Sequence, residues 1–125
     1  MQQLLWVALG GSIGAVFRYL LASAIYQFTG RDFPYGTLMV NVLGSFIIGV
    51  LSIWLVEKYE LSSELRLAII VGGLGAFTTF STFSWETIQL IEQGALIRAG
   101  LNIVLSVVLC LLGTWLGMMW ARQSV

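Results

Sequence analysis

Hydroxyl side chains next to three glycines mark the stretch of the chain best suited to binding an ion. Within residues 72–84 the glycines are followed by five hydroxyl residues: Gly72, Gly73, Gly75, Thr78, Thr79, Ser81, Thr82 and Ser84. Each glycine lowers helix stability by ~1 kcal/mol relative to alanine, and Ser and Thr hydroxyls compete for backbone hydrogen bonds. A membrane helix interrupted in this way frees carbonyls and amides that can hold ions. The stretch therefore predicts either an ion site on a broken helix or a packing seam of small residues.

Three phenylalanines, Phe77, Phe80 and Phe83, recur every third residue through the same stretch. An aromatic stripe of this kind is usually core packing. The edge of an aromatic ring carries partial positive charge, however, so ring edges beside hydroxyl and amide donors can coordinate a small anion. A fixed lysine would hold that anion too tightly for it to move on. Both interpretations of the stripe remain open at the level of the residues.

One basic and one acidic residue lie well inside apolar segments, Arg18 and Glu86. A centred arginine costs ~2.5–3.5 kcal/mol on insertion scales, so Arg18 is expected to face a wet cavity or to reach the membrane interface. In a cavity it would form a cationic vestibule that attracts anions. We interpret Glu86 as a helix-end carboxylate that reaches the interface.

The composition is that of an integral membrane protein. The 125 residues are 58% hydrophobic and 10% charged, whereas a soluble domain carries roughly 25% charged residues. The net charge is zero and the chain has no histidine, which argues against nucleic-acid binding. The single cysteine, Cys110, excludes an intrachain disulfide and a Cys/His metal cluster. The sequence also lacks the catalytic constellation of an enzyme.

Four apolar segments are long enough to cross a bilayer, which takes about 20 residues. They comprise residues 4–28, 35–56, 65–91 and 99–121. The loop 57–64 that precedes the third segment offers Ser62 or Ser63 as a helix N-cap. Because no basic region precedes the first segment, it is expected to be retained rather than cleaved. We predict one all-α membrane domain over residues 1–125 with four transmembrane helices.

Small and polar residues recur along single helix faces of these segments. On the second segment one face carries Thr37, Asn41, Ser45, Gly49 and Ser52, and on the fourth an i, i+4 line carries Asn102, Ser106, Cys110 and Thr114. The pairs Gly10/Gly14 and Gly113/Gly117 predict close helix packing. The polar lines fit either hydrogen bonding between helices or a permeation path.

Three motifs together resemble the Fluc (CrcB) family of fluoride channels. They are Gly10-Gly11-Ser12-Ile13-Gly14-Ala15 followed by Arg18-Tyr19, residues 36–46 (GTLMVNVLGSF) and residues 75–84 (GAFTTFSTFS). With four expected spans in 125 residues, the likeness covers nearly the whole chain.

The resemblance implies an antiparallel, dual-topology homodimer with two fluoride pores in the bacterial inner membrane. It also implies that the third helix is broken at mid-membrane. A structural sodium ion at the dimer centre would be held there by the backbone carbonyls of Gly75 and Thr78 of each subunit.

The resemblance further assigns the pore residues. Phe80 and Phe83 match phenylalanines whose ring edges face fluoride, Asn41 matches an asparagine that points into the pore, and Arg18 matches a vestibule arginine. The hydroxyls of Ser81 and Thr82 and a polar track on the fourth helix complete the pore; the track comprises Asn102, Ser106, Cys110 and Thr114. Some relatives carry tyrosine at Asn102 and serine at Cys110, and a thiol is a weaker donor than a hydroxyl.

These residues lead us to expect a passive, fluoride-selective channel. One alternative is a small proton-coupled multidrug exporter of dual topology, but such exporters depend on a carboxylate in the first span, where this chain has Arg18 and no acid. The other alternative is a structural membrane subunit whose polar lines only join helices.

The balance of basic residues predicts insertion in both orientations. Topology follows the Lys/Arg bias of the short loops. One side would carry Lys58, Arg66 and Arg122, and the other Arg31 and Arg98. A difference of one charge is too small to fix the orientation, which fits an antiparallel dimer.

Overall fold

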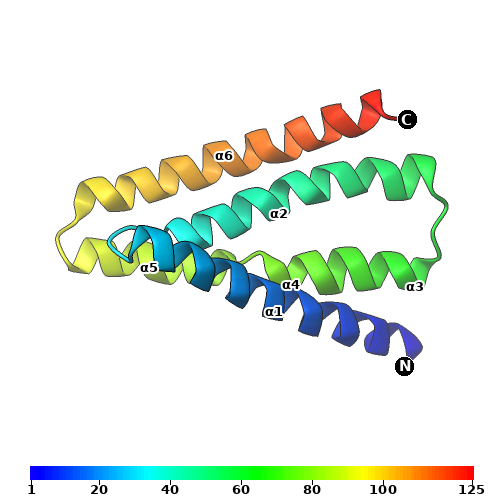
Figure 1. The fold of residues 1–125 in the computed structure, drawn as a ribbon, viewed down its shortest axis with the longest axis horizontal. Coiled ribbons are helices and arrows are strands. Elements are labelled where there is room, and N and C mark those ends of the chain that lie inside the picture. Colours follow the sequence, from blue (N-terminus) through cyan, green and yellow to red (C-terminus); the bar gives the residue numbers. More distant parts are fainter.

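The computed structural model describes all 125 residues, Met1–Val125, and every regular element in it is helical. The first span is α1 (Gln2–Thr29), and the second is α2 (Tyr35–Ile53) continued by a π-helical turn, η1 (Trp54–Lys58). The third span is assembled from α3 (Ser63–Arg66), the π-helical η2 (Leu67–Leu74), α4 (Gly75–Phe77) and α5 (Phe80–Glu92), and the fourth is α6 (Leu96–Gln123). Both termini lie at the same end of the bundle as the turn between η1 and α3 (Figure 1).

Four helical segments are long and apolar enough to cross a membrane: Gln2–Thr29, Tyr35–Lys58, Ser63–Glu92 and Leu96–Gln123. The prediction of an all-α protein with four membrane helices is therefore confirmed, and the protein is a multi-pass membrane protein. The predicted N-cap is also confirmed, because the Ser62 hydroxyl accepts from the Leu65 amide at 3.4 Å. The first span ends at Gly30, whose φ of 72° suits glycine.

Two close helix pairs organise the bundle, α2 with α6 and α1 with η2. A Cβ added to Gly10 or Gly14 would collide with backbone carbonyls of the third span. In the α2/α6 pair the same holds for Gly49 and Gly117, and a Cβ at Gly113 would lie 3.3 Å from a carbonyl oxygen of α2. The prediction that the glycine pairs allow close packing is confirmed.

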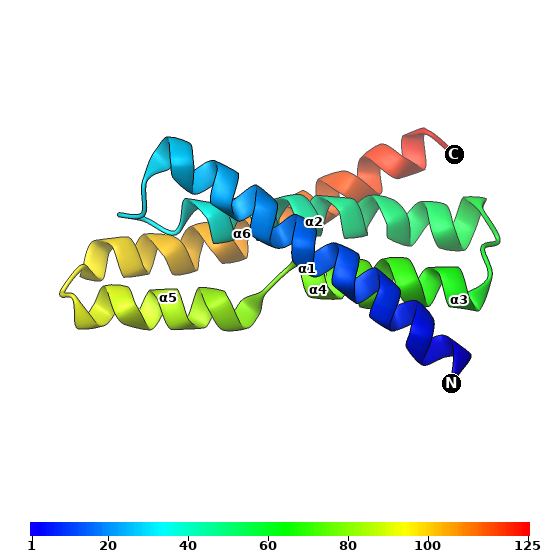
Figure 2. The ribbon, with the colours of Figure 1, turned by 60° about the horizontal axis from the view of Figure 1, so that its bottom comes forward.

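The backbone leaves the helical conformation at one place within the four spans. Thr78 (φ −84°, ψ 155°) and Thr79 (φ −151°, ψ 113°) are extended, so α4 ends at Phe77 and α5 begins at Phe80. Figure 2 shows this extended link between α4 and α5, and α1 running obliquely across the bundle. The link leaves backbone groups without helical partners, and the neighbouring elements determine how those groups are satisfied.

Candidate functional site

A cavity of about 450 Å³ lies beside the extended link. Residues of α2, the third span and α6 line it, and seven of them are residues that the sequence predicts for an ion site: Asn41, Gly75, Thr78, Phe80, Phe83, Ser106 and Cys110. Helices that are far apart in the sequence therefore bring most of the predicted site to one place. We call this cavity the phenylalanine cavity.

A second polar cavity, of about 290 Å³, contains the predicted vestibule residue. Its lining combines cationic, acidic and hydroxyl side chains, among them Arg18, Tyr26, Arg31, Thr37, Thr82 and Glu86. Arg18 is half-buried there and forms neither a hydrogen bond nor an ion pair. We call this the arginine cavity. Thr79 is the one residue that lines both cavities, so the two meet at the extended link.

Three predicted pore residues lie outside both cavities: Asn102, Thr114 and Ser81. Thr114 lies farther along α6, where its carbonyl packs against Gly49 of α2. Ser81 is exposed, and its hydroxyl oxygen lies 3.3 Å from that of Thr79. Asn102 is buried, at 1% exposure, and none of the three residues forms part of the wall of either cavity.

Asn41 holds the backbone of the extended link. Its Nδ2 donates to the Thr79 carbonyl at 3.0 Å, and its Oδ1 accepts from the Thr79 amide at 2.8 Å. Unpaired backbone groups inside a membrane are destabilising by several kcal/mol each, so an amide side chain with one donor and one acceptor suits this position. Asn41 thus lines the phenylalanine cavity and also stabilises the non-helical link.

Thr79 is a functional candidate that the sequence analysis placed only within a general hydroxyl run. It is the N-cap of α5, because its Oγ1 accepts from the Thr82 amide at 3.2 Å. The same hydroxyl donates to Thr82 Oγ1 at 3.0 Å. A threonine before an apolar helical run is a recognisable N-cap signal. Applied to residues 79–92, it would have located the start of α5.

The carbonyls of Gly75 and Thr78 are released from helical pairing. In a continuous α-helix they would accept from the amides of Thr79 and Thr82. Those amides donate instead to Asn41 Oδ1 and to Thr79 Oγ1. Two carbonyl oxygens beside a helix break are suitable ligands for a cation, and the negative C-terminal end of the helical run Ser63–Phe77 adds to them.

The two phenylalanines of the cavity form a pair but differ in burial. The ring centroids of Phe80 and Phe83 are 5.2 Å apart and the planes are tilted by 45°. Phe83 is 8% exposed, whereas Phe80 is 77% exposed. Phe77, the third member of the stripe, packs in the core with Val40 and Leu74. The packing interpretation therefore describes Phe77, and the other two rings border polar groups.

Glu86, which we expect to reach the membrane interface, makes a specific contact with α2. Its Oε1 accepts from the Thr37 hydroxyl at 2.8 Å, and its Oε2 is buried without a hydrogen-bond partner. This contact forms because α2 brings Thr37 opposite the carboxylate. Glu86 thus belongs to the wall of the arginine cavity.

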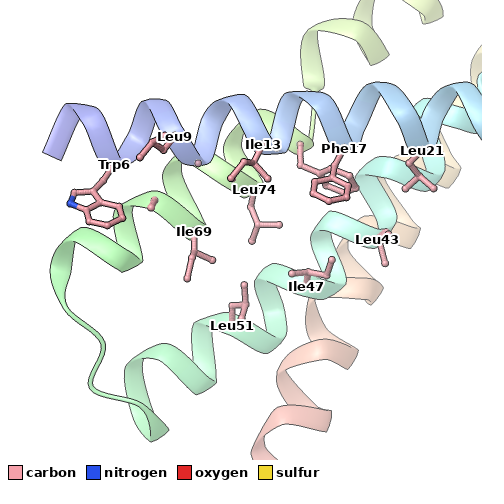
Figure 3. Close-up of a pocket in the computed structure, with 15 residues that line it drawn as sticks. Trp6, Leu9, Ile13, Phe17, Leu21, Leu43, Ile47, Leu51, Ile69 and Leu74 are labelled. Atoms are coloured by element: carbon pink, nitrogen blue, oxygen red, sulfur yellow. The ribbon is translucent and has the colours of Figure 1, made fainter. Parts of the chain in front are cut away.

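A third cavity, of about 700 Å³, is the largest and is apolar (Figure 3). Its wall combines α1, α2 and the third span and includes Trp6, Ile13, Phe17, Ile47, Leu51 and Ile69. The wall has no charged or hydroxyl side chain, so it offers no ligand to an ion. Side chains that can bind an ion therefore lie outside this cavity: in the phenylalanine cavity, in the arginine cavity and in a further polar cavity of about 280 Å³ whose wall includes Arg31, Glu86 and Arg98.

Comparison with known sequences decides the family. Residues 5–118 match the family described as CrcB-like protein, Camphor Resistance (CrcB). The chain belongs to the CrcB family. This agrees with the resemblance carried by the glycine, asparagine and phenylalanine motifs.

Similar proteins in the CrcB family carry a specific name. The fluoride-specific ion channel FluC of Geobacter sulfurreducens is 51% identical over 123 residues, which cover 98% of this chain and 99% of the relative. That of Magnetococcus marinus is 52% identical, with 96% and 98% covered. FluC of Methylococcus capsulatus is 51% identical over 94% of this chain, which spans about half of that relative's length (51%).

Proposed function

We propose that this CrcB-family protein is a fluoride-selective ion channel that carries fluoride passively across the bacterial inner membrane. The observation that carries the proposal is the identity of about one half, over nearly the whole chain, to fluoride-specific ion channels. Transport of this kind involves no covalent chemistry, so the protein is not an enzyme. Because HF crosses lipid and ionises at neutral internal pH, a passive pore would release fluoride trapped in the cytoplasm.

The anion path we propose joins the two polar cavities at Thr79. Arg18 in the arginine cavity would attract anions. Because it lies outside the phenylalanine cavity, it would place no fixed positive charge in the narrow part of the path. The positive end of α5 points toward the extended link, and the amides of its first turn lack helical acceptors. From there fluoride would pass the edges of Phe80 and Phe83 toward Ser106 and Cys110. Ser81 and Thr82 would supply hydroxyls at the entrance, and Thr114 a hydroxyl farther along α6.

We propose that two copies pair antiparallel and that the extended link lies at mid-membrane. The phenylalanine cavity has polar walls, and polar, irregular backbone is not tolerated against lipid. Its neighbour Phe80 is 77% exposed in the protomer. A second protein surface is therefore needed to close the cavity. A twofold axis in the membrane plane would provide it and would create two pores.

A structural sodium ion fits the released carbonyls of Gly75 and Thr78. Gly75 is exposed in the protomer, so an antiparallel partner could bring its own pair of carbonyls to the same place. Four carbonyl oxygens without a carboxylate suit a monovalent cation better than calcium or magnesium, whose sites favour carboxylates. The ion would join the two links and supply positive charge between the pores.

Purified protein in liposomes is expected to pass fluoride rapidly and chloride at an undetectable rate. The walls of the phenylalanine cavity offer hydroxyl and amide donors and ring edges but no lysine, which suits a small, hard anion that must leave again. Efflux measured with fluoride- and chloride-sensitive electrodes checks this. Comparable chloride flux would contradict fluoride selectivity, and no flux of either ion would favour the structural-subunit alternative. Proton-coupled drug transport in the same vesicles would favour the exporter alternative.

The parent protein is expected to insert in both orientations. Lys58 Nζ donates to the Ser124 carbonyl at one end of the bundle, and Arg98 donates to the Asp32 carbonyl at the other, so basic residues lie at both ends. A compartment-sensitive reporter on the C-terminus should therefore report from both sides of the membrane.

Adding two lysines to one end gives the matched test of this orientation. Each biased variant alone should lose most fluoride flux because parallel copies cannot pair. Co-expression of two oppositely biased variants should restore it. A parent reporter on one side only would refute the antiparallel assembly.

A further inference from the structure

A chain of side-chain hydrogen bonds joins α5 to α6 behind the phenylalanine cavity. Thr87 Oγ1 donates to the Phe83 carbonyl at 2.7 Å, Asn102 Nδ2 donates to Thr87 Oγ1 at 2.9 Å, and Ser106 Oγ donates to Asn102 Oδ1 at 3.4 Å. Asn102 is 1% exposed and does not line the cavity, whereas Ser106 does. The chain therefore ends at a hydroxyl in the proposed pore.

The direction of every proton in this chain is fixed by its first member. A carbonyl oxygen can only accept, so the single hydroxyl proton of Thr87 is committed to Phe83. The Thr87 oxygen can then only accept, and Asn102 must present its NH₂ group to it. The amide oxygen of Asn102 consequently faces Ser106 and takes the single hydroxyl proton of that serine.

This direction of the Ser106 proton disfavours binding of an anion in the phenylalanine cavity. With its proton directed to Asn102, Ser106 presents lone pairs to the cavity rather than a donor. Fluoride can be bound by this hydroxyl only if the proton turns away from Asn102. The bond to be exchanged is long, at 3.4 Å, and thus weak.

We propose that Asn102 is a positioning residue that directs the Ser106 hydroxyl proton away from the pore until an anion competes for it. The inference rests on the proposed fluoride channel. Each anion that binds at Ser106 must replace the bond to Asn102, and the bond re-forms when the anion leaves. Binding at Ser106 is thereby weakened, which favours release and rapid passage.

Two variants release the Ser106 proton by different routes. Asn102→Leu removes the acceptor while nearly keeping the volume of the side chain. Thr87→Val keeps the shape of Thr87 but removes its oxygen, so the Asn102 amide can turn and donate to Ser106. In liposome flux measured against fluoride concentration, each should lower the half-saturating concentration by about twofold to tenfold, the equivalent of one neutral hydrogen bond. Each should also lower the maximal flux, because fluoride leaves more slowly.

The Ser106→Ala background separates positioning from a merely structural role. There both substitutions should lose their effect on half-saturation, because no hydroxyl remains to be directed. Ser52→Ala is the matched control: its hydroxyl bonds to Gly49 within α2 and lines neither polar cavity, so half-saturation should not change. Half-saturation that stays constant or rises in both variants, or an effect that persists in the Ser106→Ala background, overturns the inference but leaves the channel intact. A parent protein without fluoride flux overturns both.

Discussion

Phe83→Ile and Phe80→Ile should each reduce the fluoride flux per amount of reconstituted protein by up to about tenfold. Isoleucine keeps an apolar, bulky side chain but has no polarised ring edge. The interaction of such an edge with another aromatic ring is worth about 0.5–1.5 kcal/mol beyond burial, and we expect an effect of the same order for the anion. Both rings border the phenylalanine cavity, and their centroids are 5.2 Å apart. Initial efflux rates from liposomes, normalised to the amount of folded protein recovered in size-exclusion chromatography, measure the effect.

Phe77→Ile is the control that the same stripe provides. Phe77 packs against Val40 and Leu74 and borders the apolar cavity rather than a polar one. Its replacement should reduce stability by about 1–3 kcal/mol without reducing the flux per amount of folded protein. If all three variants conduct like the parent, the whole stripe is packing and the ring edges do not contact the ion.

Replacement of Asn41 should reduce flux by about tenfold to a hundredfold. In Asn41→Asp the ionised carboxylate can still accept from the Thr79 amide, but it faces the Thr79 carbonyl with a second acceptor. In Asn41→Leu both bonds are absent. Losing a buried partner for a polar group is destabilising by about 1–3 kcal/mol. Here the amide and carbonyl of Thr79, in the extended link beside the cavity, would lose their partner. Liposome efflux and thermal unfolding in detergent, measured together, test this.

Ser45→Ala provides the comparison for Asn41. Ser45 lies one turn farther along α2, lines the same cavity and makes no hydrogen bond to the link. Its effect on flux and on unfolding should be small. An Asn41→Leu protein that conducts and unfolds like the parent would show that Asn41 does not support the link.

Much of this architecture is predictable from the sequence because bilayer thickness restricts what an apolar segment can do. The four membrane helices, the Ser62 cap and the close approach at Gly10 and Gly14 all follow from residue types and spacing. The gathering of Phe80, Phe83 and Asn41 was expected only from the family resemblance. Hydropathy carries no information about which faces of separate helices meet.

Partners across helices were the part that the sequence did not predict. The Thr37–Glu86 bond and the pairing of Asn41 with the Thr79 backbone depend on the rotation of α2 against α5. The chain Thr87–Asn102–Ser106 likewise depends on how α5 and α6 are aligned. A helical periodicity places Asn102 and Ser106 on one line, but it cannot identify the hydroxyl on another helix that determines their protons.

The two hydrogen bonds between Asn41 and the Thr79 backbone have a consequence for the insertion of the chain into the membrane. Synthesis proceeds from the N-terminus, so α2 enters the membrane before the third span does. When the third span follows, its two non-helical residues bring an amide and a carbonyl that lipid cannot pair. The side chain that pairs with both is already present on the preceding helix. Because insertion starts from the N-terminus, Asn41 is in the membrane before the Thr79 backbone that it pairs. A variant that lacks Asn41 should therefore be impaired first in membrane insertion of the third span, before any effect on the folded protein.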